Sequence, residues 1–423
     1  MQSILNYLIF GVLFFSLIST PAPTHLEICD VILLMLSLLI GLISMSAIKN
    51  YYINKIECRL ILAISFYVSY LCISTVLGLA HGISFITIAR NIGPYVNFLP
   101  LLLIGFAPSS LLRPGHVAIM LILVGLLQAG YHFFLYFTTS IHSDTTRDIL
   151  IGRITLIDPR TSLPLFLALA ILPVSVFFNH GLVPNDKSFS LLSITMIIIG
   201  FFAGIVTLTR AIILSIFFGW IVFIGLYLYY QMNLQSNQIK PVIRKLSFYT
   251  ICLAFILLII LNIPAVRILF SGIVARFYNT STIVGVSDYS NGRLYDEWLP
   301  AFNTWKQTDF LGLLFGVGAG QPFLLATGET HTYTHNLCLY SLLYGGFYGL
   351  FACLWLYFST FKVLIIRAFE TQHTLYLGYA SLLASMFFYV QLFAVYKLLA
   401  FNAMLILLMA LALNRQTERS MII

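Results

Sequence analysis

The feature that most constrains this chain is a succession of long apolar runs separated by short polar connections. The run LFLALAILPVSVFF at residues 165–178 is continuous rather than alternating, which favours helices over the strands of a barrel. Only 9% of the residues are charged, against about 25% in soluble domains. Because lipid cannot hydrogen-bond bare backbone, we expect an all-α polytopic membrane protein. It should form one membrane domain over residues 1–423.

Apolar windows of roughly 20 residues predict about 12 transmembrane helices. They lie near residues 4–20, 30–48, 60–79, 86–107, 115–138, 161–179, 189–208, 211–231, 247–265, 336–360, 374–394 and 398–413. The stretch 189–231 is too long for one span at about 1.5 Å per residue. It should therefore form two helices, with its only charged residue, Arg210, at the tip of a tight hairpin.

Positive charge predicts the orientation of these spans. Lysines and arginines occur in four connections and the C-terminal tail, namely 49–59, 180–188, 232–246, 361–373 and 414–423. With an even number of spans these segments share a side with both termini, and that side should be cytoplasmic. Two long loops, 139–160 and 266–335, then face outward. The second, with roughly seventy residues, is too long for a passive connection, so we expect it to fold with short helices.

A set of arginines is expected on the outer face. Guanidinium groups stay charged in apolar surroundings and bind phosphates through paired hydrogen bonds. They predict a cationic cavity for an anionic, phosphorylated substrate. The alternative is that they contact lipid headgroups or pair with acidic residues such as Asp296 and Glu297. The arginines concerned are Arg90, Arg153, Arg160, Arg210 and Arg293.

The tract HTYTHN, residues 331–336, places two histidines at the lip of an apolar helix. His331 and His335 are four residues apart, as metal ligands on one helix face can be, but no third ligand is evident. His335 and Asn336 instead fall at the predicted start of a helix. Such an N-terminus favours an anion, and histidine exchanges protons near neutral pH. The simpler alternative is that Thr334 or Asn336 is an ordinary N-cap.

Two glycine clusters flank this tract. FGVGAGQPF, residues 315–323, has neither the strand and helix nor the GK[ST] of a nucleotide-binding loop, so we interpret its glycines as permitting a tight backbone path. Gly345 and Gly349, four residues apart, should allow close helix packing. The cations are scattered rather than clustered, which argues against nucleic acid as a partner.

Three stretches, taken in order, resemble one known family. TLTRAIILSIFFGW contains Arg210, NGRLYDEWLPAF contains Arg293, and GVGAGQPF is followed by THNLCLYSLLYGGFYGL with His335 and Asn336. Together they resemble the O-antigen polymerase and O-antigen ligase superfamily of bacterial inner membranes, over roughly residues 205–350. The Ser-Arg-Gly usual in the first motif is Thr-Arg-Ala here.

The resemblance implies a glycosyltransferase of the bacterial inner membrane whose active site faces the periplasm. Its donor would be an oligosaccharide linked to undecaprenyl pyrophosphate, with no metal or nucleotide cofactor. Arg210 and Arg293 would hold the pyrophosphate and His335 would act at the reacting hydroxyl. Tyr295 and Trp298 are candidates to stack on sugars.

The resemblance leaves the acceptor open. In a polymerase it is another lipid-linked repeat unit, and a chain-length regulator is then a candidate partner. In a ligase it is a sugar of lipid A–core. We favour the polymerase because the 266–335 loop resembles a large cover for a glycan. A transporter or flippase is a third hypothesis, but we find neither charged pairs near mid-membrane nor matching half-repeats.

Overall fold

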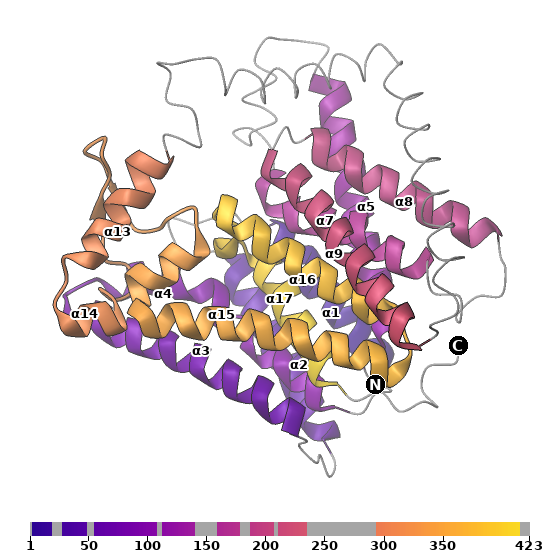
Figure 1. The fold of residues 1–423 in the computed structure, drawn as a ribbon, viewed down its shortest axis with the longest axis horizontal. Coiled ribbons are helices and arrows are strands. Elements are labelled where there is room, and N and C mark those ends of the chain that lie inside the picture. Colours follow the sequence, from indigo (N-terminus) through magenta and orange to yellow (C-terminus); the bar gives the residue numbers. More distant parts are fainter. Residues whose placement is uncertain are drawn as a thin grey trace.

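The structure, a computed structural model, describes residues 2–18, 28–48, 55–107, 112–139, 159–177, 187–206, 210–234 and 293–414. This part is mostly helical (Figure 1). Its elements are α1 (Gln2–Ile18), α2 (Ile28–Ala47), α3 (Lys55–Ala80), α4 (Phe85–Val96), η1 (Leu99–Phe106), α5 (Pro114–Thr139), α7 (Pro159–Phe177), α8 (Lys187–Val206), α9 (Arg210–Leu234), η3 (Arg293–Trp298), α13 (Leu299–Lys306), α14 (Phe310–Phe315), β1 (Phe323–Leu324), β2 (Thr330–His331), α15 (Leu337–Thr371), α16 (Leu375–Leu392), η4 (Val395–Lys397) and α17 (Leu399–Leu413).

Five helices of the described part are long and apolar enough to cross a membrane. They are Lys55–Ala80, Pro114–Tyr131, Ala211–Asn233, Leu337–Thr371 and Leu375–Leu392. Shorter apolar helices accompany them, among them Val31–Ala47 and Leu399–Leu413. The expected fold class, an all-α membrane protein, is confirmed at this level. The predicted span 247–265 and most of the 139–160 loop lie outside the described residues.

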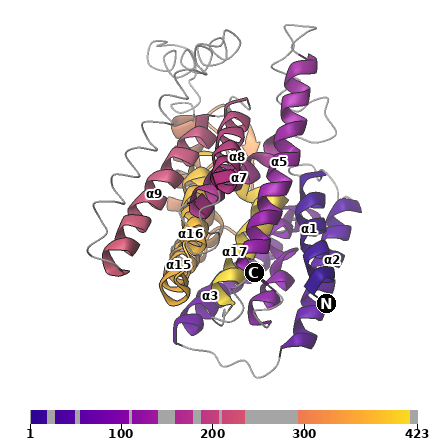
Figure 2. The same ribbon diagram turned by 90° about the vertical axis from the view of Figure 1, so that its right-hand side faces the viewer.

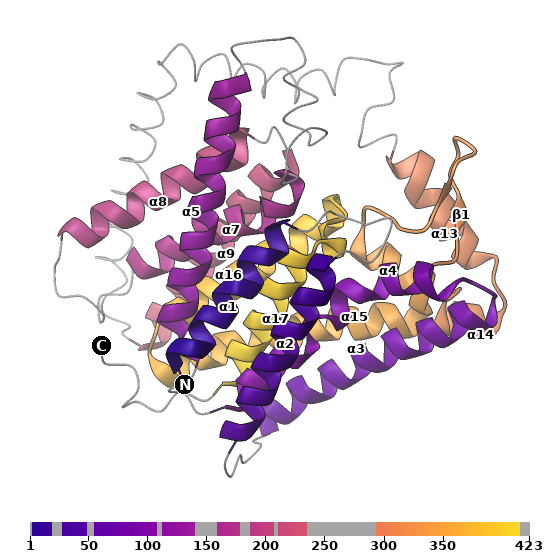
Figure 3. The same cartoon turned by 180° about the vertical axis from the view of Figure 1, so that it is seen from behind.

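The helices α15, α16 and α17 form the centre of the molecule, with α9 on one side and α1 and α2 on the other (Figure 2). The longest pair, α3 and α15, lies side by side in both broad views (Figures 1 and 3). These two helices run antiparallel. Ser74 Oγ of α3 donates to the Tyr344 carbonyl near the start of α15, at 2.8 Å. Glu57, in the first turn of α3, bonds Arg367 near the end of α15.

The antiparallel arrangement defines two ends of the molecule. We name them the His335 end, where α15 begins, and the Arg367 end, where it finishes. The helix α9 finishes at the Arg367 end, because the Tyr230 ring lies 5.1 Å from the Phe369 ring. Arg210, the first residue of α9, therefore starts that helix at the His335 end. The separation of α8 from α9 confirms that 189–231 is two helices.

The GVGAG segment wedges between α3 and α15 at the His335 end. The Val317 amide donates to the Leu343 carbonyl at 2.9 Å, and the Ala319 amide donates to the Ser74 carbonyl at 2.8 Å. Gly316 and Gly318 have φ of 78° and 89°, and a Cβ on Gly316 would lie 2.3 Å from a backbone nitrogen of α15. Both the conformation and the close approach require glycine. The interpretation as a tight backbone path is confirmed.

The packing role expected of Gly345 and Gly349 is also confirmed. A Cβ at Gly345 would lie 2.2 Å from the ring of Tyr70 on α3, and a Cβ at Gly349 would lie 2.8 Å from it. The intervening Gly346 has φ of 61° and interrupts α15 with a kink. The short strands β1 and β2 pair antiparallel, with Phe323 opposite His331.

The predicted span 86–107 is wrong as a continuous helix. It is divided into α4, which ends at Val96, and the 3-10 helix η1, which begins at Leu99. Pro94 and Pro100 explain the division, because proline lacks a backbone N–H and its ring crowds the preceding turn. Hydropathy alone did not register either effect.

The predicted connection 361–373 is also wrong, because α15 continues through it to Thr371. Arg367, which was assigned to that connection, is a buried helix residue. Its guanidinium bonds Glu57 at 2.7 Å and Glu370 at 2.8 Å. These two carboxylates stabilise the positive charge of Arg367 inside the helix bundle. A hydropathy profile registers only the charge, and therefore predicts a loop.

Candidate functional site

The centre of the site is a pair formed by His335 and Glu297. His335 Nδ1 lies 2.6 Å from Glu297 Oε2, and the His335 backbone N–H donates to Glu297 Oε1. The Glu297 side chain is 7% exposed and that of His335 is 21% exposed. A carboxylate at Nδ1 selects the tautomer that carries its proton there. Nε2 is then the acceptor nitrogen, and it has no hydrogen-bond partner among the described residues.

Glu297 reaches His335 from the short π-helix η3, which lies well before α15 in the chain. The Ala326 amide donates to the Asp296 carbonyl at 3.0 Å, so the loop after α14 holds η3 against the β1–β2 hairpin. The following helix α13 packs onto α15, and the Trp305 ring lies 5.1 Å from the Phe347 ring. Figure 1 shows α13, α14 and α4 gathered at this end of the molecule.

The start of α15 is fixed by Asn336. Its side chain accepts from the Leu339 amide at 2.9 Å and donates to the Gln391 carbonyl of α16 at 3.2 Å. The buried Tyr396 hydroxyl donates to the carbonyl of Thr334. The N-cap alternative is thus confirmed for Asn336, and the same cap anchors the backbone that carries His335.

A lysine and an aromatic ring extend the site beyond this pair. Tyr333 lies between the two histidines in sequence, and its ring centroid is 5.6 Å from that of His335. Lys397 Nζ lies 4.1 Å from the Tyr333 ring centroid and donates to Asn91 Oδ1 at 3.1 Å. The chain thus brings α4, η3, the start of α15 and η4 to one place.

Burial changes the proton affinity of the lysine. The Lys397 side chain is half-buried, and desolvation lowers its pKa to about 7. Lys397 is therefore able to exchange a proton near neutral pH. The lysine and His335 both contact the ring of Tyr333, so two groups that can serve acid–base chemistry lie close together.

Some of the predicted site residues contribute to this cluster and others stand apart from it. His335 and Asn336 are at its centre. Trp298 follows Glu297 and is half-buried, and its indole N–H has no partner among the described residues. Tyr295 is 62% exposed. Arg90 is exposed on α4, directly before the Asn91 that contacts Lys397.

The other predicted arginines are described less fully. Arg293 begins η3 and Arg210 begins α9, both at the His335 end. Arg160 belongs to the first turn of α7. The side chains of these three arginines, and the whole of Arg153, lie outside the described residues.

The two histidines have different surroundings. His331 stacks on Tyr333 with ring centroids 5.5 Å apart, while His335 is held by Glu297. Within the described ranges, no group of three or more His, Cys, Asp or Glu side chains is placed to hold a metal ion.

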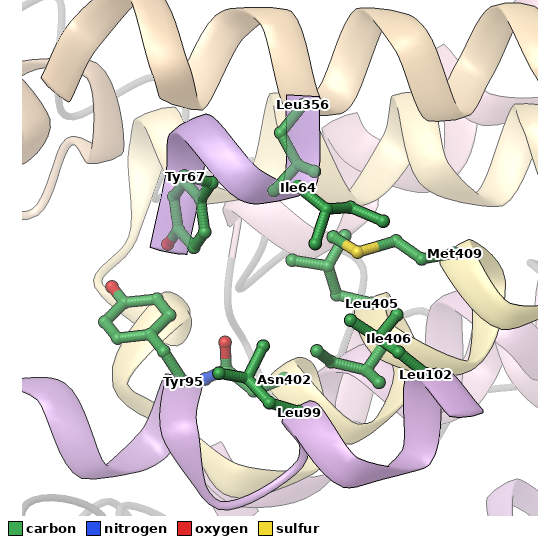
Figure 4. Close-up of a pocket in the computed structure, with 10 residues that line it drawn as sticks. All are labelled: Ile64, Tyr67, Tyr95, Leu99, Leu102, Leu356, Asn402, Leu405, Ile406 and Met409. Atoms are coloured by element: carbon green, nitrogen blue, oxygen red, sulfur yellow. The ribbon is translucent and has the colours of Figure 1, made fainter. Parts of the chain in front are cut away.

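A small crevice lies beside the site, between α3, α4, η1, α15 and α17 (Figure 4). The tyrosine hydroxyls of Tyr67 and Tyr95 occupy one side, and Asn402 lies near them (Figure 4). The rest of the lining is apolar: Ile64, Leu99, Leu102, Leu356, Leu405, Ile406 and Met409. With no group that titrates near neutral pH in its lining and room for little more than a water molecule, the crevice is not suited to proton transfer.

Sequence reasoning missed three residues of the site. Glu297 was considered only as a partner for arginine, and Lys397 and Asn91 were not singled out. Lys397 did leave a signal, because it is the only charged residue in the apolar stretch 375–413. A lone ionisable residue between apolar segments suggests function by default. Glu297 left none, since its contact with His335 spans 38 residues.

The chain matches no known protein family. No curated protein matches it either.

Proposed function

We propose that this protein is an O-antigen polymerase. It would be a multi-pass glycosyltransferase of the bacterial inner membrane that joins oligosaccharide units linked to undecaprenyl pyrophosphate. The proposal includes about 12 spans with both termini in the cytoplasm, so that the His335 end faces the periplasm. The observation that carries it is the Glu297–His335 pair, in which a buried carboxylate orients an imidazole at the mouth of a helix bundle.

This pair suits a base in glycosyl transfer. Nε2 of His335 takes the proton from the acceptor hydroxyl as its oxygen bonds to the anomeric carbon of the donor. The bond from that carbon to the phosphate oxygen breaks, and undecaprenyl pyrophosphate leaves with the electron pair. Glu297 keeps the imidazole in the productive tautomer and stabilises the imidazolium that forms.

The leaving group requires positive charge, because negative charge builds on the pyrophosphate as the bond breaks. Arg210 and Arg293 are the proposed clamps, supported by the family resemblance and by the start of α9 and of η3 at the His335 end. Arg90, Arg153 and Arg160 are proposed as further contacts to the donor. Tyr295, exposed on η3, is proposed to stack on a sugar.

The test is complementation of a strain that lacks the gene. The wild-type gene restores lipopolysaccharide with many repeats, whereas His335→Ala leaves a single repeat, because loss of a general base costs roughly 10²–10⁴-fold in rate. His331→Ala, four residues away, is the matched control and keeps the long chains. Equal membrane levels of each variant are checked by immunoblot.

Other outcomes of the same gel would change the proposal. Lipopolysaccharide ending at the core in the deletion strain would assign the protein as the ligase. Long chains made by His335→Ala at wild-type levels would exclude the base role altogether.

A further inference from the structure

Lys397, at the edge of the site, is a cation without an acidic partner among the described residues. The ion pairs among the described residues join His335 to Glu297, and Arg367 to Glu57 and Glu370. Lys397 has no carboxylate within ion-pair distance in that part of the chain. A buried ammonium without a counter-ion either loses its proton or acquires an anion from outside the protein.

The position of the ammonium is set from two sides. Asn91 donates its Nδ2 to the Thr87 carbonyl one turn back in α4, at 2.9 Å, which directs Oδ1 toward Lys397. The Tyr333 ring covers another side of the ammonium at 4.1 Å. An ammonium has three donors. Asn91 takes one and the ring face attracts a second, so a third is left for an acceptor that none of the described residues supplies.

The same ring links Lys397 to the proposed base. Tyr333 contacts both Lys397 and His335, and Tyr396, next to Lys397, hydrogen-bonds the carbonyl of Thr334. An anion bound at Lys397 would therefore lie close to the group that reacts at His335. In the proposed reaction, the anion nearest the reacting carbon is the pyrophosphate.

We propose that Lys397, positioned by Asn91 and Tyr333, binds a phosphate oxygen of the lipid-linked donor. The assignment rests on the proposed function for the identity of that donor. Lys397, which belongs to η4, would be a third cation for the donor beside the proposed clamps Arg210 and Arg293. The chemistry recognised is a phosphate oxygen, which a phospholipid headgroup also carries, so the test has to separate the two sources.

The test measures binding rather than turnover. Purified full-length protein in neutral detergent is titrated with inorganic pyrophosphate at constant ionic strength, and the melting temperature is followed. Lys397→Met is compared with Lys397→Arg and with Lys362→Met, an exposed lysine toward the far end of α15. The unliganded melting temperature of each variant shows whether it is folded.

We expect pyrophosphate to stabilise the wild type and Lys362→Met. Lys397→Met should need roughly ten times more pyrophosphate for the same shift, since it loses a charge-assisted hydrogen bond. Lys397→Arg should keep part of the response. An unchanged midpoint in folded Lys397→Met would overturn the assignment.

A second arm identifies the source of the phosphate. The same proteins are placed in nanodiscs of phosphatidylcholine, with or without phosphatidylglycerol. Stabilisation by phosphatidylglycerol that depends on Lys397, with no response to pyrophosphate, would assign a headgroup and overturn the donor proposal.

The phosphate site and the polymerase proposal can fail separately. Pyrophosphate binding that depends on Lys397, in a protein whose gene deletion leaves long-chain lipopolysaccharide intact, would keep the phosphate site and reject the polymerase. If Lys397→Met left pyrophosphate binding unchanged while His335→Ala was inactive, the polymerase proposal would stand and the phosphate site at Lys397 would be rejected.

Discussion

The two ends of α15 carry clusters of acidic and basic side chains that differ in how fully they are satisfied. At the Arg367 end, the guanidinium bonds Glu57, Glu370 and the carbonyls of Ala412 and Leu413. At the His335 end, Glu297 accepts two hydrogen bonds from His335, but Nε2 of His335 has no partner among the described residues.

This difference separates a structural cluster from the proposed reactive one. The Arg367 cluster joins α3, α15 and the last turn of α17, and its guanidinium bonds both carboxylates of the cluster. Among the described residues, the His335 end leaves an imidazole nitrogen without a partner and the Lys397 ammonium without a carboxylate. Buried polar groups that the protein leaves unpaired mark a place where a ligand can bind.

The largest expected effect is on stability at the Arg367 end. Arg367→Met removes the guanidinium that bonds the buried Glu57 carboxylate, which should cost about 3–5 kcal/mol of unfolding free energy. The measurement is thermal unfolding of the purified protein in detergent. Glu57→Met combined with Arg367→Met should recover most of the loss, because a buried pair replaced by apolar side chains is often neutral.

Glu370→Gln is the control for this substitution. The Glu370 side chain is 42% exposed, so its pair with Arg367 should contribute about 0–1 kcal/mol. A melting temperature for Arg367→Met equal to that of Glu370→Gln would show that the Arg367 cluster is not the structural one.

The next effect is on activity at the His335 end. Glu297→Gln replaces the acceptor of the Nδ1 proton with an amide, which favours the opposite tautomer and removes the free lone pair from Nε2. We expect O-antigen polymerisation to fall by roughly a hundredfold or more, with little change in melting temperature. Polymerisation is followed as chain-length distribution per amount of protein in isolated membranes.

Asp296→Asn, the neighbouring carboxylate of η3, is the matched control and should retain activity. If Glu297→Gln lowered the melting temperature as much as Arg367→Met does, Glu297 would also belong to a structural cluster. The comparison between the two ends would then fail.

Local patterns in the sequence predicted those parts of the fold that depend on neighbouring residues. The length of the apolar stretch 189–231 required two helices, and the polar tract before Leu337 predicted where α15 begins. Hydropathy predicted the wrong helix boundaries where a distant partner or a proline determines whether the helix continues. The carboxylate that holds Arg367 inside α15 lies 310 residues away in the chain.

The candidate site divides in the same way. His335 and Asn336 were identified because a helix N-terminus and an imidazole have local signatures. Glu297 and the Asn91–Lys397 contact depend on contacts across 38 and 306 residues. No spacing rule in a single sequence reports such contacts. The carboxylate that orients His335 is therefore evident only from the folded arrangement, whereas His335 itself, the proposed base, could be identified from the sequence.

The smallest expected effect is a pH dependence of stability at the Arg367 end. His373 Nδ1 accepts the Leu375 amide at the start of α16, at 3.2 Å. Burial lowers the pKa of His373 to about 4. The folded protein thus favours neutral His373, whereas the unfolded chain takes up its proton near pH 6.5, the reference value for histidine. Stability should fall as pH decreases from about 6.5 toward 4 and level off below that.

His373→Asn isolates this contribution, because an asparagine side chain can accept the same amide without titrating. The wild type should lose more unfolding free energy than the variant over that pH range, by at most about 3 kcal/mol, since each pKa unit corresponds to about 1.4 kcal/mol. Melting temperatures of both proteins across the range measure the difference, with His81→Asn, an exposed histidine at the His335 end, as the control. Parallel curves for wild type and His373→Asn would mean that the imidazole does not cap α16 in its neutral form. In that case the stability of the Arg367 end would depend on the Arg367 ion pairs without help from this cap.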